Sequence, residues 1–363
     1  MESREAPQET SADCIAKPST SSEQSLHEDK DSMNSAHRYE RAASKTEYKV
    51  DYSIVITEYS VSDSSDHEVL ECEPGESEAD LPRHWRICSK NPRHTGFIPV
   101  KELSLVHATV TNKVNELVSV INIVADLTVR IAVYFTSSAR PSVIEGTDVP
   151  YPCASLRGKK SLRIGTGMIV GVSKYQEEDK ITCQCKVCKV SDTPQTTWWS
   201  VGVMTATHVV FDDSEAESAT CRLFFDQADS PVVTLHGWRM WDMSIKGDTC
   251  RFSCASHDME LYEKVQKMYN SYLYCPHKFE EGVSFIVSHP HGCSKQVSVG
   301  KYKQKHIKHL QLWYNATKYS YDLSTCPGSS GAYVFTSEHL LVPHVHSGCK
   351  NGVNRSGEGF QEK

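Results

Sequence analysis

The sequence contains no run of about 18 apolar residues, the length that a membrane-spanning helix requires. Its first residues, Met-Glu-Ser-Arg-Glu-Ala-Pro, are polar and lack the apolar stretch of a secretory signal. A basic excess is missing as well, and the formal net charge is -7. Phosphate binding requires a basic surface, which argues against nucleic acid as the main partner. We therefore expect a cytoplasmic chain that binds neither a membrane nor nucleic acid.

Cysteine is plentiful, with 14 residues in a chain that shows no secretory signal. In that setting reduced thiols are expected rather than a disulfide framework. Cys183, Cys185 and Cys188 lie close together, and the last pair has the spacing of zinc ligands. No fourth ligand stands out nearby, so free thiols in a long hairpin loop are the favoured interpretation. The three cysteines stay a weak metal candidate, and no cofactor is expected.

The N-terminal third differs in composition from the rest of the chain. Residues 1–46 are rich in Ser, Glu, Asp and Lys, which predicts a disordered tail, and 48–56 could form a strand. Residues 47–140 are expected to form an extension with an amphipathic helix near 102–125. We expect this helix to pack on its own domain, and the extension is where a protein partner could bind. The helical stripe consists of Leu103, Val106, Val110, Val114, Leu117, Ile121 and Val124.

Residues 141–363 form the second expected domain, and from about residue 160 short apolar runs alternate with Gly, Pro, Asp and Ser. Many short strands without long helices between them indicate an antiparallel sandwich or barrel. The fold class expected is therefore mainly β. The strand candidates are Gly167–Gly171, Val201–Met204, Cys221–Phe225, Val232–Leu235, Val283–Val287, Gln296–Val299 and Ala332–Phe335.

Three short segments of this region carry residues that could act together. In Met204-Thr-Ala-Thr-His208 an apolar strand runs into a histidine, and in His257-Asp258-Met-Glu-Leu261 an aspartate heads an expected strand. In Cys326-Pro-Gly-Ser-Ser330-Gly-Ala a tight turn of small residues feeds another strand. Each segment alone is typical of ordinary structure. Their joint presence in the order His, Asp, Ser is what indicates a function.

The chemistry explains why these residue types belong together. A serine hydroxyl is a poor nucleophile near neutral pH, so a neutral imidazole must take its proton. A buried carboxylate fixes the tautomer of that imidazole and stabilises its positive charge. The tight turn around Ser330 would aim the N–H groups of Gly328 and Ser330 at the oxyanion. His208, Asp258 and Ser330 are thus predicted as base, orienting residue and nucleophile, with Asp248 and Asp242 as alternatives to Asp258.

These segments resemble motifs of the trypsin/chymotrypsin-like serine peptidases. Thr205-Ala-Thr-His208 is similar to their Thr-Ala-Ala-His motif, and Gly328-Ser-Ser330-Gly331 to their Gly-Asp-Ser-Gly motif. His257–Leu261 resembles the stretch that holds the family's aspartate, and 287–300 resembles a hairpin of the second barrel in compact members. The resemblance covers about residues 160–350. It implies two six-stranded antiparallel β-barrels, near 160–262 and 280–350, with the site between them.

The resemblance also implies where a substrate binds. Ser324, six residues before the nucleophile, would form the base of the specificity pocket, and it carries no charge to attract Lys or Arg. His346, Ser347 and Gly348 resemble the strand that pairs with the substrate backbone. His344 and His346 would point to one face of their strand and could favour an acidic residue before the cleaved bond. Ordinary surface histidines are the alternative interpretation.

We therefore expect a serine endopeptidase that acts on polypeptides through an acyl-enzyme at Ser330. One alternative is a pseudoprotease, in which the same fold serves as a protein-interaction module with an inactive site. Another is a β-sandwich scaffold in which the three segments lie far apart. Ser329 stands where the family has an acidic residue, so activation by a new N-terminus that binds this residue is not expected.

Overall fold

The computed structural model describes most of the chain beyond residue 66. The predicted tail 1–46 and the predicted strand 48–56 lie outside the described residues. Among the described helices, none combines the length and the apolar character that a membrane span would need. The described residues are 67–72, 75–103, 114–275, 279, 282–309, 314–337, 344–350 and 352–362.

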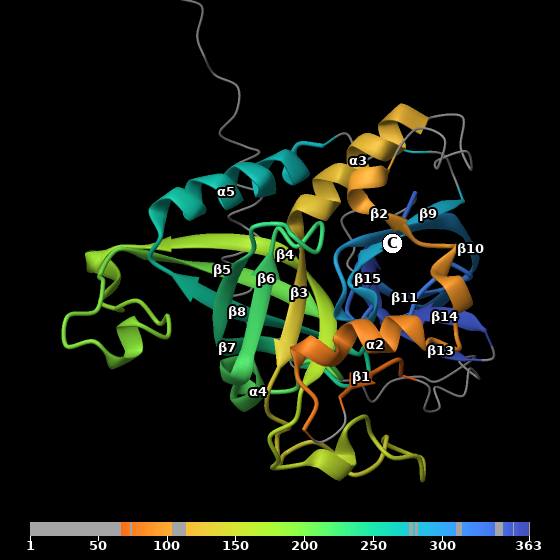
Figure 1. The fold of residues 1–363 in the computed structure, drawn as a ribbon, viewed down its shortest axis with the longest axis horizontal. Helices are drawn as coiled ribbons and strands as arrows, with labels where there is room; N and C mark the ends of the chain where they lie inside the picture. Colours follow the sequence, from red (N-terminus) through yellow and green to blue (C-terminus); the bar gives the residue numbers. More distant parts are fainter. Residues whose placement is uncertain are drawn as a thin grey trace, which may run out of the picture. The chain divides into compact units, whose positions relative to one another are not determined.

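Six antiparallel strands close the first barrel (Figure 1). They follow the order β4-β3-β6-β7-β8-β5, and β5 pairs with β4 again. Because β3 is a barrel strand, this barrel begins near residue 128, so the predicted boundaries at 141 and 160 are wrong. Its strands are β3 (Thr128–Val133), β4 (Arg163–Tyr175), β5 (Trp198–Thr205), β6 (Ala219–Leu223), β7 (Val233–Ser244) and β8 (Thr249–Ser256), with β1 (Leu70–Glu71) added beside β4.

The second sheet is a half-barrel in the order β12-β9-β10-β11-β14-β13. An isolated bridge between Tyr333 and Val345 joins its two ends. The fold is thus mainly β with the chymotrypsin-like arrangement that the sequence predicted, although only the first barrel is closed by a full strand pairing. The strands are β9 (Val283–Ser288), β10 (Gln296–His309), β11 (Tyr314–Tyr321), β12 (Val334–Thr336), β13 (His346–Lys350), β14 (Val353–Ser356) and β15 (Gly359–Glu362), with β2 (Ile98–Pro99) paired to β10.

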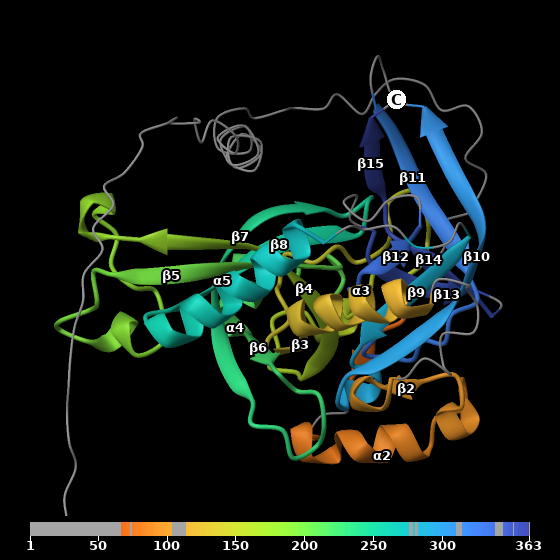
Figure 2. The same cartoon turned by 90° about the horizontal axis from the view of Figure 1, so that it is seen from above.

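Helices flank the strands. Figures 1 and 2 show α5 along the first barrel, with α3 between it and the second sheet. In α3 the predicted apolar stripe is buried at Leu117, Ile121 and Val124, whereas its part in 104–113 lies outside the described residues. The helices are α2 (Leu81–Arg86), α3 (Val114–Leu127), α4 (Asp213–Ser218) and α5 (Met259–Leu273). Short 3-10 helices are η1 (Glu78–Asp80), η2 (Pro92–His94), η3 (Val100–Glu102), η5 (Ala154–Leu156), η6 (Glu177–Asp179), η7 (Cys188–Val190) and η8 (Pro290–Gly292).

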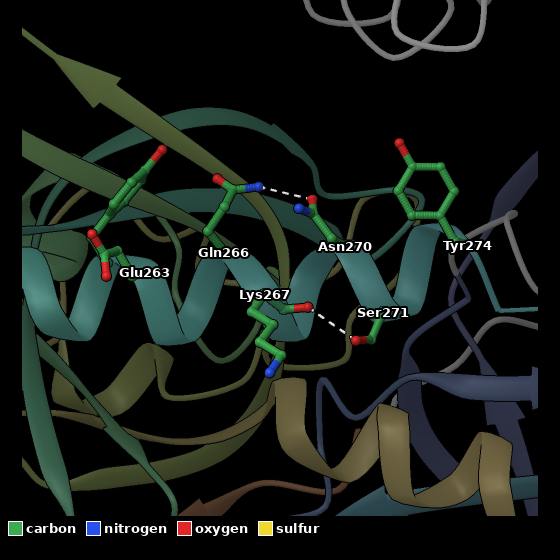
Figure 3. Close-up of a pocket in the computed structure, with 7 residues that line it drawn as sticks. Glu263, Gln266, Lys267, Asn270, Ser271 and Tyr274 are labelled. Atoms are coloured by element: carbon green, nitrogen blue, oxygen red, sulfur yellow. Dashed lines mark hydrogen bonds between the residues drawn. The ribbon is translucent and has the colours of Figure 1, made fainter. Parts of the chain in front are cut away.

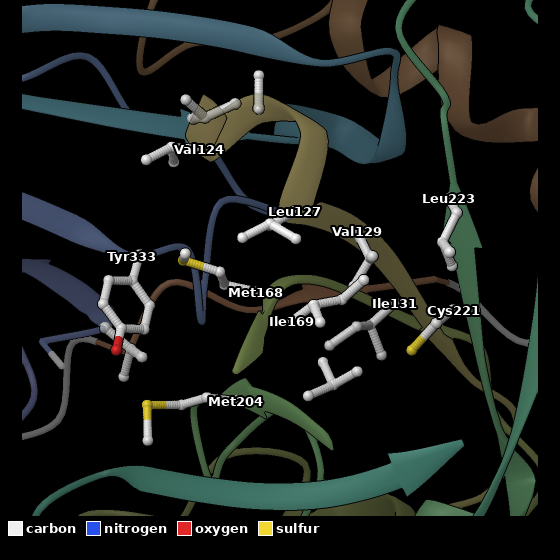
Figure 4. Packing of buried hydrophobic residues seen from close by; sticks show 14 of the residues in the cluster. Val124, Leu127, Val129, Ile131, Met168, Ile169, Met204, Cys221, Leu223 and Tyr333 are labelled. Atoms are coloured by element: carbon white, nitrogen blue, oxygen red, sulfur yellow. The ribbon is translucent and has the colours of Figure 1, made fainter. Parts of the chain in front are cut away.

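One apolar core reaches from α3 through the first barrel to the second sheet. Figure 4 shows α3 side chains Val124 and Leu127 beside Val129 of β3, with Tyr333 from the second sheet nearby. The same cluster continues through Phe285 of β9, so the two sheets share buried surface. Burial of apolar area is the main force that holds such layers together. This core fixes the two sheets against each other and thereby positions the loops between them.

A buried ion cluster fixes the backbone around His208. Glu215 of α4 binds Arg140 at 2.6 Å and 2.7 Å and Arg163 at 2.6 Å, and all three side chains are buried. Arg140 also donates to the His208 carbonyl at 3.0 Å, and Arg163 to the Val209 carbonyl at 2.9 Å. Burial alone would raise the pKa of Glu215, but Arg163 and Arg140 hold it below its usual value. The carboxylate is therefore ionised and anchors the turn that carries His208.

Replacing Glu215 by glutamine is expected to lower the free energy of unfolding by about 3–5 kcal/mol, because two buried arginines lose their counter-charge. Chemical denaturation of the full chain measures this loss. Since the pKa of Glu215 is held below its ordinary value of 4.5, the contribution is complete above that pH and is lost as pH falls through the folded pKa.

Glu217 provides the matched control on the same helix. It is exposed and contacts Lys189 at 3.2 Å on the surface, so Glu217→Gln should change the unfolding free energy by less than about 1 kcal/mol. Equal losses for the two variants would show that the buried cluster does not stabilise the fold.

Candidate functional site

His208 lies in the turn that follows β5, and Asp248 holds its imidazole. The Asp248 carboxylate accepts the His208 backbone N–H at 3.1 Å and contacts Nδ1 at 2.8 Å and 3.0 Å. The Ser347 hydroxyl also donates to this carboxylate. With Nδ1 donating to Asp248, Nε2 is the free nitrogen of the ring, and it has no partner among the described residues. This is the tautomer that a general base needs.

Asp258 does not orient His208, which corrects the sequence-based choice in favour of the alternative Asp248. Asp258 is the N-cap of α5, and its side chain accepts the Leu261 backbone N–H at 3.0 Å. The segment after Asp258 is accordingly a helix and not the predicted strand. The third choice, Asp242, forms an exposed ion pair with Arg251. Asp248 instead lies in the turn between β7 and β8 with φ of 50°, a conformation that aspartate tolerates better than most residues.

Ser330 lies in a buried turn that packs against the strand end before His208. Its neighbour Gly331 has φ of 82°, and a Cβ there would lie 2.9 Å from the Ala206 nitrogen. Gly328, two residues earlier, has φ of 99° and lies against His289, where a Cβ would approach the carbonyl oxygen to 2.7 Å. Glycine is therefore required on both sides of the Ser329-Ser330 pair. Among the described residues, no hydrogen bond uses the backbone N–H of Gly328 or Ser330.

Burial and charge set the ionisation of the His208–Asp248 pair. Burial lowers the pKa of His208, against the opposing effect of Asp248, so the imidazole is neutral near neutral pH. Burial alone would raise the pKa of Asp248, but His208 and His67 hold it well below its usual value. A neutral imidazole beside an ionised carboxylate is the state in which a histidine accepts a proton from serine.

The chain's own residues His67 and Glu68 lie across this site. The Ser330 hydroxyl donates to the Glu68 carbonyl oxygen, and the His67 ring lies 4.8 Å from the His208 ring, centre to centre. The Glu68 backbone N–H donates to the Ser347 carbonyl at 3.2 Å, and His67 forms an antiparallel bridge with Gly348. His208 and Ser330 therefore face the same dipeptide, which rules out the scaffold interpretation in which they lie far apart.

The Glu68 carboxylate fills a polar pocket. It accepts from Lys90 Nζ at 2.6 Å, from His346 Nε2 at 2.8 Å and from Thr325 Oγ1 at 2.9 Å. The Tyr321 hydroxyl donates to His346 Nδ1 at 2.7 Å, which leaves the hydrogen of that neutral ring on Nε2. Burial alone would raise the pKa of Glu68, but His346 and Lys90 lower it to about 2. The pocket thus binds an ionised carboxylate.

The structure places the predicted substrate-binding residues around this pocket. His346 contacts the carboxylate, whereas Ser347 and Gly348 contact the backbone of the bound segment. Ser324 lines the same pocket, but Thr325 is the residue that reaches the carboxylate. His344 is buried elsewhere, against Thr317 at 2.8 Å.

Sequence reasoning missed three members of the pocket: Lys90, Thr325 and Asn354. Lys90 belongs to the N-terminal extension and reaches the site only through long-range packing, so no local pattern marks it. Thr325 directly follows Ser324, the residue predicted at the base of the pocket, so that prediction was one position away from the residue that binds the carboxylate. Asn354 lies beyond Ala332–Phe335, the last of the strand candidates.

Two groups of cysteine and histidine lie outside this site and have the composition of metal centres. Within each group the four potential ligand atoms all lie within 4.8 Å of one another. The Cys183 cluster consists of Cys183, Cys185, Cys188 and His257, and the Cys88 cluster consists of Cys88, His94, His291 and Cys326.

A surface depression along α5 is a poorer candidate for function. It is lined by residues of this helix and its C-cap, from Tyr262 to Tyr274 (Figure 3). Gln266 and Asn270 bond to each other at 3.0 Å, and Ser271 donates to the Lys267 carbonyl. None of these groups is arranged as a nucleophile beside a base.

Comparisons with known proteins give likeness in structure only. No protein-family model and no curated protein matches the chain. The HtrA-type protease AlgW with decapeptide shares 11% identity, covering 66% of this chain and 62% of its own, with a TM-score of 0.34. The Rv3671c protease from M. tuberculosis, active form, shares 11% identity, covering 70% of this chain and 82% of its own, with a TM-score of 0.34. The chain thus spans less than two thirds of AlgW.

Likeness at this level does not establish a shared activity. The stronger observation is the strand order of the two sheets, with His208 after a strand of the first barrel and Ser330 before a strand of the second. Asp248 reaches His208 from the first barrel, and β13 of the second sheet pairs with the segment that crosses the site. The chain has the double-barrel fold of trypsin-like serine proteases.

Proposed function

We propose that the chain is a serine endopeptidase that cleaves polypeptides after acidic residues, with Ser330 as nucleophile. The observation that supports this most is the Ser330 hydroxyl at the carbonyl of Glu68, next to a histidine that Asp248 orients. A peptide segment in extended contact with Ser347 and Gly348 lies as a substrate would lie. Function at this level follows from the site and not from the fold.

The reaction would proceed through an acyl-enzyme. His208 Nε2 takes the proton of Ser330 Oγ as the oxygen attacks the substrate carbonyl, and Asp248 stabilises the imidazolium. The N–H groups of Gly328 and Ser330 would bind the oxyanion. The leaving amine takes the proton from His208, and water then hydrolyses the ester and regenerates the serine.

The preference for an acidic residue would come from the pocket that holds Glu68. Lys90 provides a positive charge, while His346 and Thr325 provide neutral donors. Hydrogen bonds to an ionised group are stronger than bonds between neutral groups. A lysine or arginine side chain would meet Lys90 in the same pocket and be repelled.

The first test is labelling of Ser330 with a fluorophosphonate probe, which reacts with activated serines. Wild type and Glu68→Ala should both be labelled. Glu68→Ala should be labelled faster, because its shortened side chain no longer fills the pocket beside Ser330. Ser330→Ala should not be labelled. Asp248→Asn should slow labelling on the order of 10⁴-fold, because the histidine loses its correct tautomer.

Asp258→Asn is the matched control for Asp248→Asn. Asparagine caps a helix about as well as aspartate, so this variant should be labelled at the wild-type rate. If neither folded wild type nor folded Glu68→Ala is labelled, the chain is a pseudoprotease and the proposal is wrong.

The pocket is tested by cleavage of peptides that differ only in the residue before the scissile bond. In the Glu68→Ala chain, glutamate should exceed glutamine in kcat/KM by about 10–100-fold, the effect of one charged hydrogen bond. Added to the Glu68→Ala chain, Lys90→Met should bring this ratio close to one. It should slow cleavage after glutamate and leave cleavage after glutamine nearly unchanged.

The control variant is Lys174→Met, which removes an exposed lysine of β4 far along the strand from the pocket. Combined with Glu68→Ala, it should leave the ratio of glutamate to glutamine cleavage at the value of Glu68→Ala alone. Faster cleavage after lysine than after glutamate, or a ratio that Lys90→Met leaves unchanged in the Glu68→Ala chain, would overturn the proposed specificity.

A further inference from the structure

The Cys183 cluster joins three neighbouring cysteines to a histidine that lies far away in the sequence. Its three cysteines belong to the long loop between β4 and β5, which projects from the first barrel in Figure 1. His257 comes from the end of β8, immediately before α5. The His257 Nδ1 lies 3.6 Å from Cys183 Sγ, 3.4 Å from Cys185 Sγ and 3.4 Å from Cys188 Sγ. The histidine is the fourth ligand that the sequence alone did not reveal.

These distances are those of a tetrahedral zinc site. With Zn–S of about 2.3 Å and Zn–N of about 2.0 Å, the sulfur and nitrogen ligands of one tetrahedron lie about 3.5 Å apart. The three Sγ atoms lie 3.4–3.6 Å from the His257 Nδ1, which matches this distance between two ligands of one tetrahedron. Backbone N–H groups of Cys185 and Cys188 donate to Cys183 Sγ and Cys185 Sγ at 3.4 Å, which would stabilise the thiolates.

The Cys88 cluster joins three parts of the fold. Cys88 and His94 belong to the extension around α2 and η2, His291 belongs to η8, and Cys326 belongs to the turn that carries Ser330. The sulfur atoms of Cys88 and Cys326 lie 3.6 Å apart, close to the tetrahedral edge of about 3.8 Å between two zinc-bound sulfurs. The ring centres of His94 and His291 lie 5.3 Å apart.

Unpartnered polar atoms in the Cys88 cluster point to a ligand. Among the described residues, His94 Nε2 and both ring nitrogens of His291 are buried without a hydrogen-bond partner. Buried polar atoms are normally satisfied, so such atoms require an explanation. Asn91 donates its backbone N–H to Cys88 Sγ at 3.4 Å and its side-chain amide to Cys326 Sγ at 3.1 Å. Two cysteine sulfurs that accept hydrogen bonds, beside two imidazoles with unpartnered nitrogens, form a complete Cys₂His₂ donor set.

We propose that the chain binds two structural zinc ions, one in each cluster. Four protein ligands close each site, which is the pattern of structural and not catalytic zinc. The Cys183 ion would fold the β4–β5 loop onto the end of β8. The Cys88 ion would hold the extension against the nucleophile turn, since Cys326 lies four residues before Ser330. The His291 backbone N–H already donates to the Pro327 carbonyl of that turn at 2.6 Å.

The metal content of the purified full chain tests the proposal. Wild type grown with zinc should contain two zinc ions per chain, and Cys88→Ala and Cys185→Ala should each contain one. Cys275→Ala, a half-buried cysteine in neither cluster, should keep two. Cys88→Ala should also slow the reaction of Ser330 with the fluorophosphonate probe, whereas Cys185→Ala should mainly lower stability.

Cobalt(II) provides a measurement that does not depend on the variants folding. The wild-type chain reconstituted with cobalt should show the intense visible absorption of tetrahedral cobalt with thiolate ligands. A wild-type chain that contains no zinc and gives only weak octahedral cobalt bands would overturn both sites. A native disulfide between Cys88 and Cys326, detected by mass spectrometry, would overturn the second site alone.

A separate observation concerns the segment that crosses the active site. Glu68 binds Ser347 on one side of Ser330, and on the other side Leu70 pairs with Ile164 and Glu71 with Arg163. The chain is thus held in extended form on both sides of the Glu68–Val69 peptide bond. We infer that this bond is a self-cleavage site, an inference that rests on the proposed endopeptidase function.

The cleavage is balanced with water as the only co-reactant. Ser330 Oγ bonds to the Glu68 carbonyl carbon, the bond to the Val69 nitrogen breaks, and the amine takes the proton held by His208. Water then hydrolyses the ester, which releases the Glu68 carboxylate and restores Ser330. The products are residues 1–68 and 69–363, and their masses add up to that of the intact chain plus one water.

Intact-mass spectrometry of the purified chain over time tests this inference. Wild type should yield both fragments at a first-order rate that does not change with protein concentration, with Val69 as the new N-terminal residue. Ser330→Ala should stay intact, and Glu68→Gln should be cut about 10–100-fold more slowly. Glu71→Gln, which changes the other glutamate of the same segment, should be cut at the wild-type rate.

Two results separate this inference from the proposed function. If the chain cleaves added glutamate peptides while its own Glu68–Val69 bond stays intact, the segment is an inhibitor and the inference is wrong, but the endopeptidase function stands. If neither the added peptides nor the chain itself is cleaved, both proposals are wrong.

Discussion

Glu215 is a buried carboxylate on which the geometry of the site depends. It binds two buried arginines, and each arginine also holds one carbonyl of the His208–Val209 backbone. Two buried guanidinium groups would be costly without their counter-charge. The cluster therefore fixes the histidine backbone, and Asp248 only has to set the direction and tautomer of the ring.

The second sheet contributes the turn that carries Ser330, the proposed nucleophile, and the strand that pairs with the backbone of His67 and Glu68. Ser330 and the 346–348 segment are joined directly, because the Gly331 N–H donates to the His346 carbonyl at 2.8 Å. The same His346 contacts the Glu68 carboxylate through its side chain. The contacts to the Glu68 backbone, the contact to its carboxylate and the position of Ser330 thus depend on one pair of neighbouring segments. Lys90 extends this unit into the N-terminal extension, which is therefore part of the site.

The sequence predicted the β-rich fold, His208 and Ser330, because a strand ending in histidine and a glycine-bounded serine turn are local patterns. It favoured Asp258 over Asp248, because an aspartate before Met-Glu-Leu was interpreted as the start of a strand and not as a helix cap. Only long-range packing brings Lys90 to Glu68 and His257 to the three cysteines. No spacing rule could pair residues that lie so far apart in the sequence. The same limit hid the fourth ligand of the Cys183 cluster.

One site is proposed to combine an activated Ser330 with a pocket for a carboxylate. A pair of peptidyl diphenyl phosphonates, one a glutamate analogue and the other a lysine analogue, tests both parts in one inactivation measurement. We expect an adduct on Ser330, formed much faster with the glutamate analogue and lost in His208→Ala. Inactivation at equal rates, or an adduct on another residue, would contradict it.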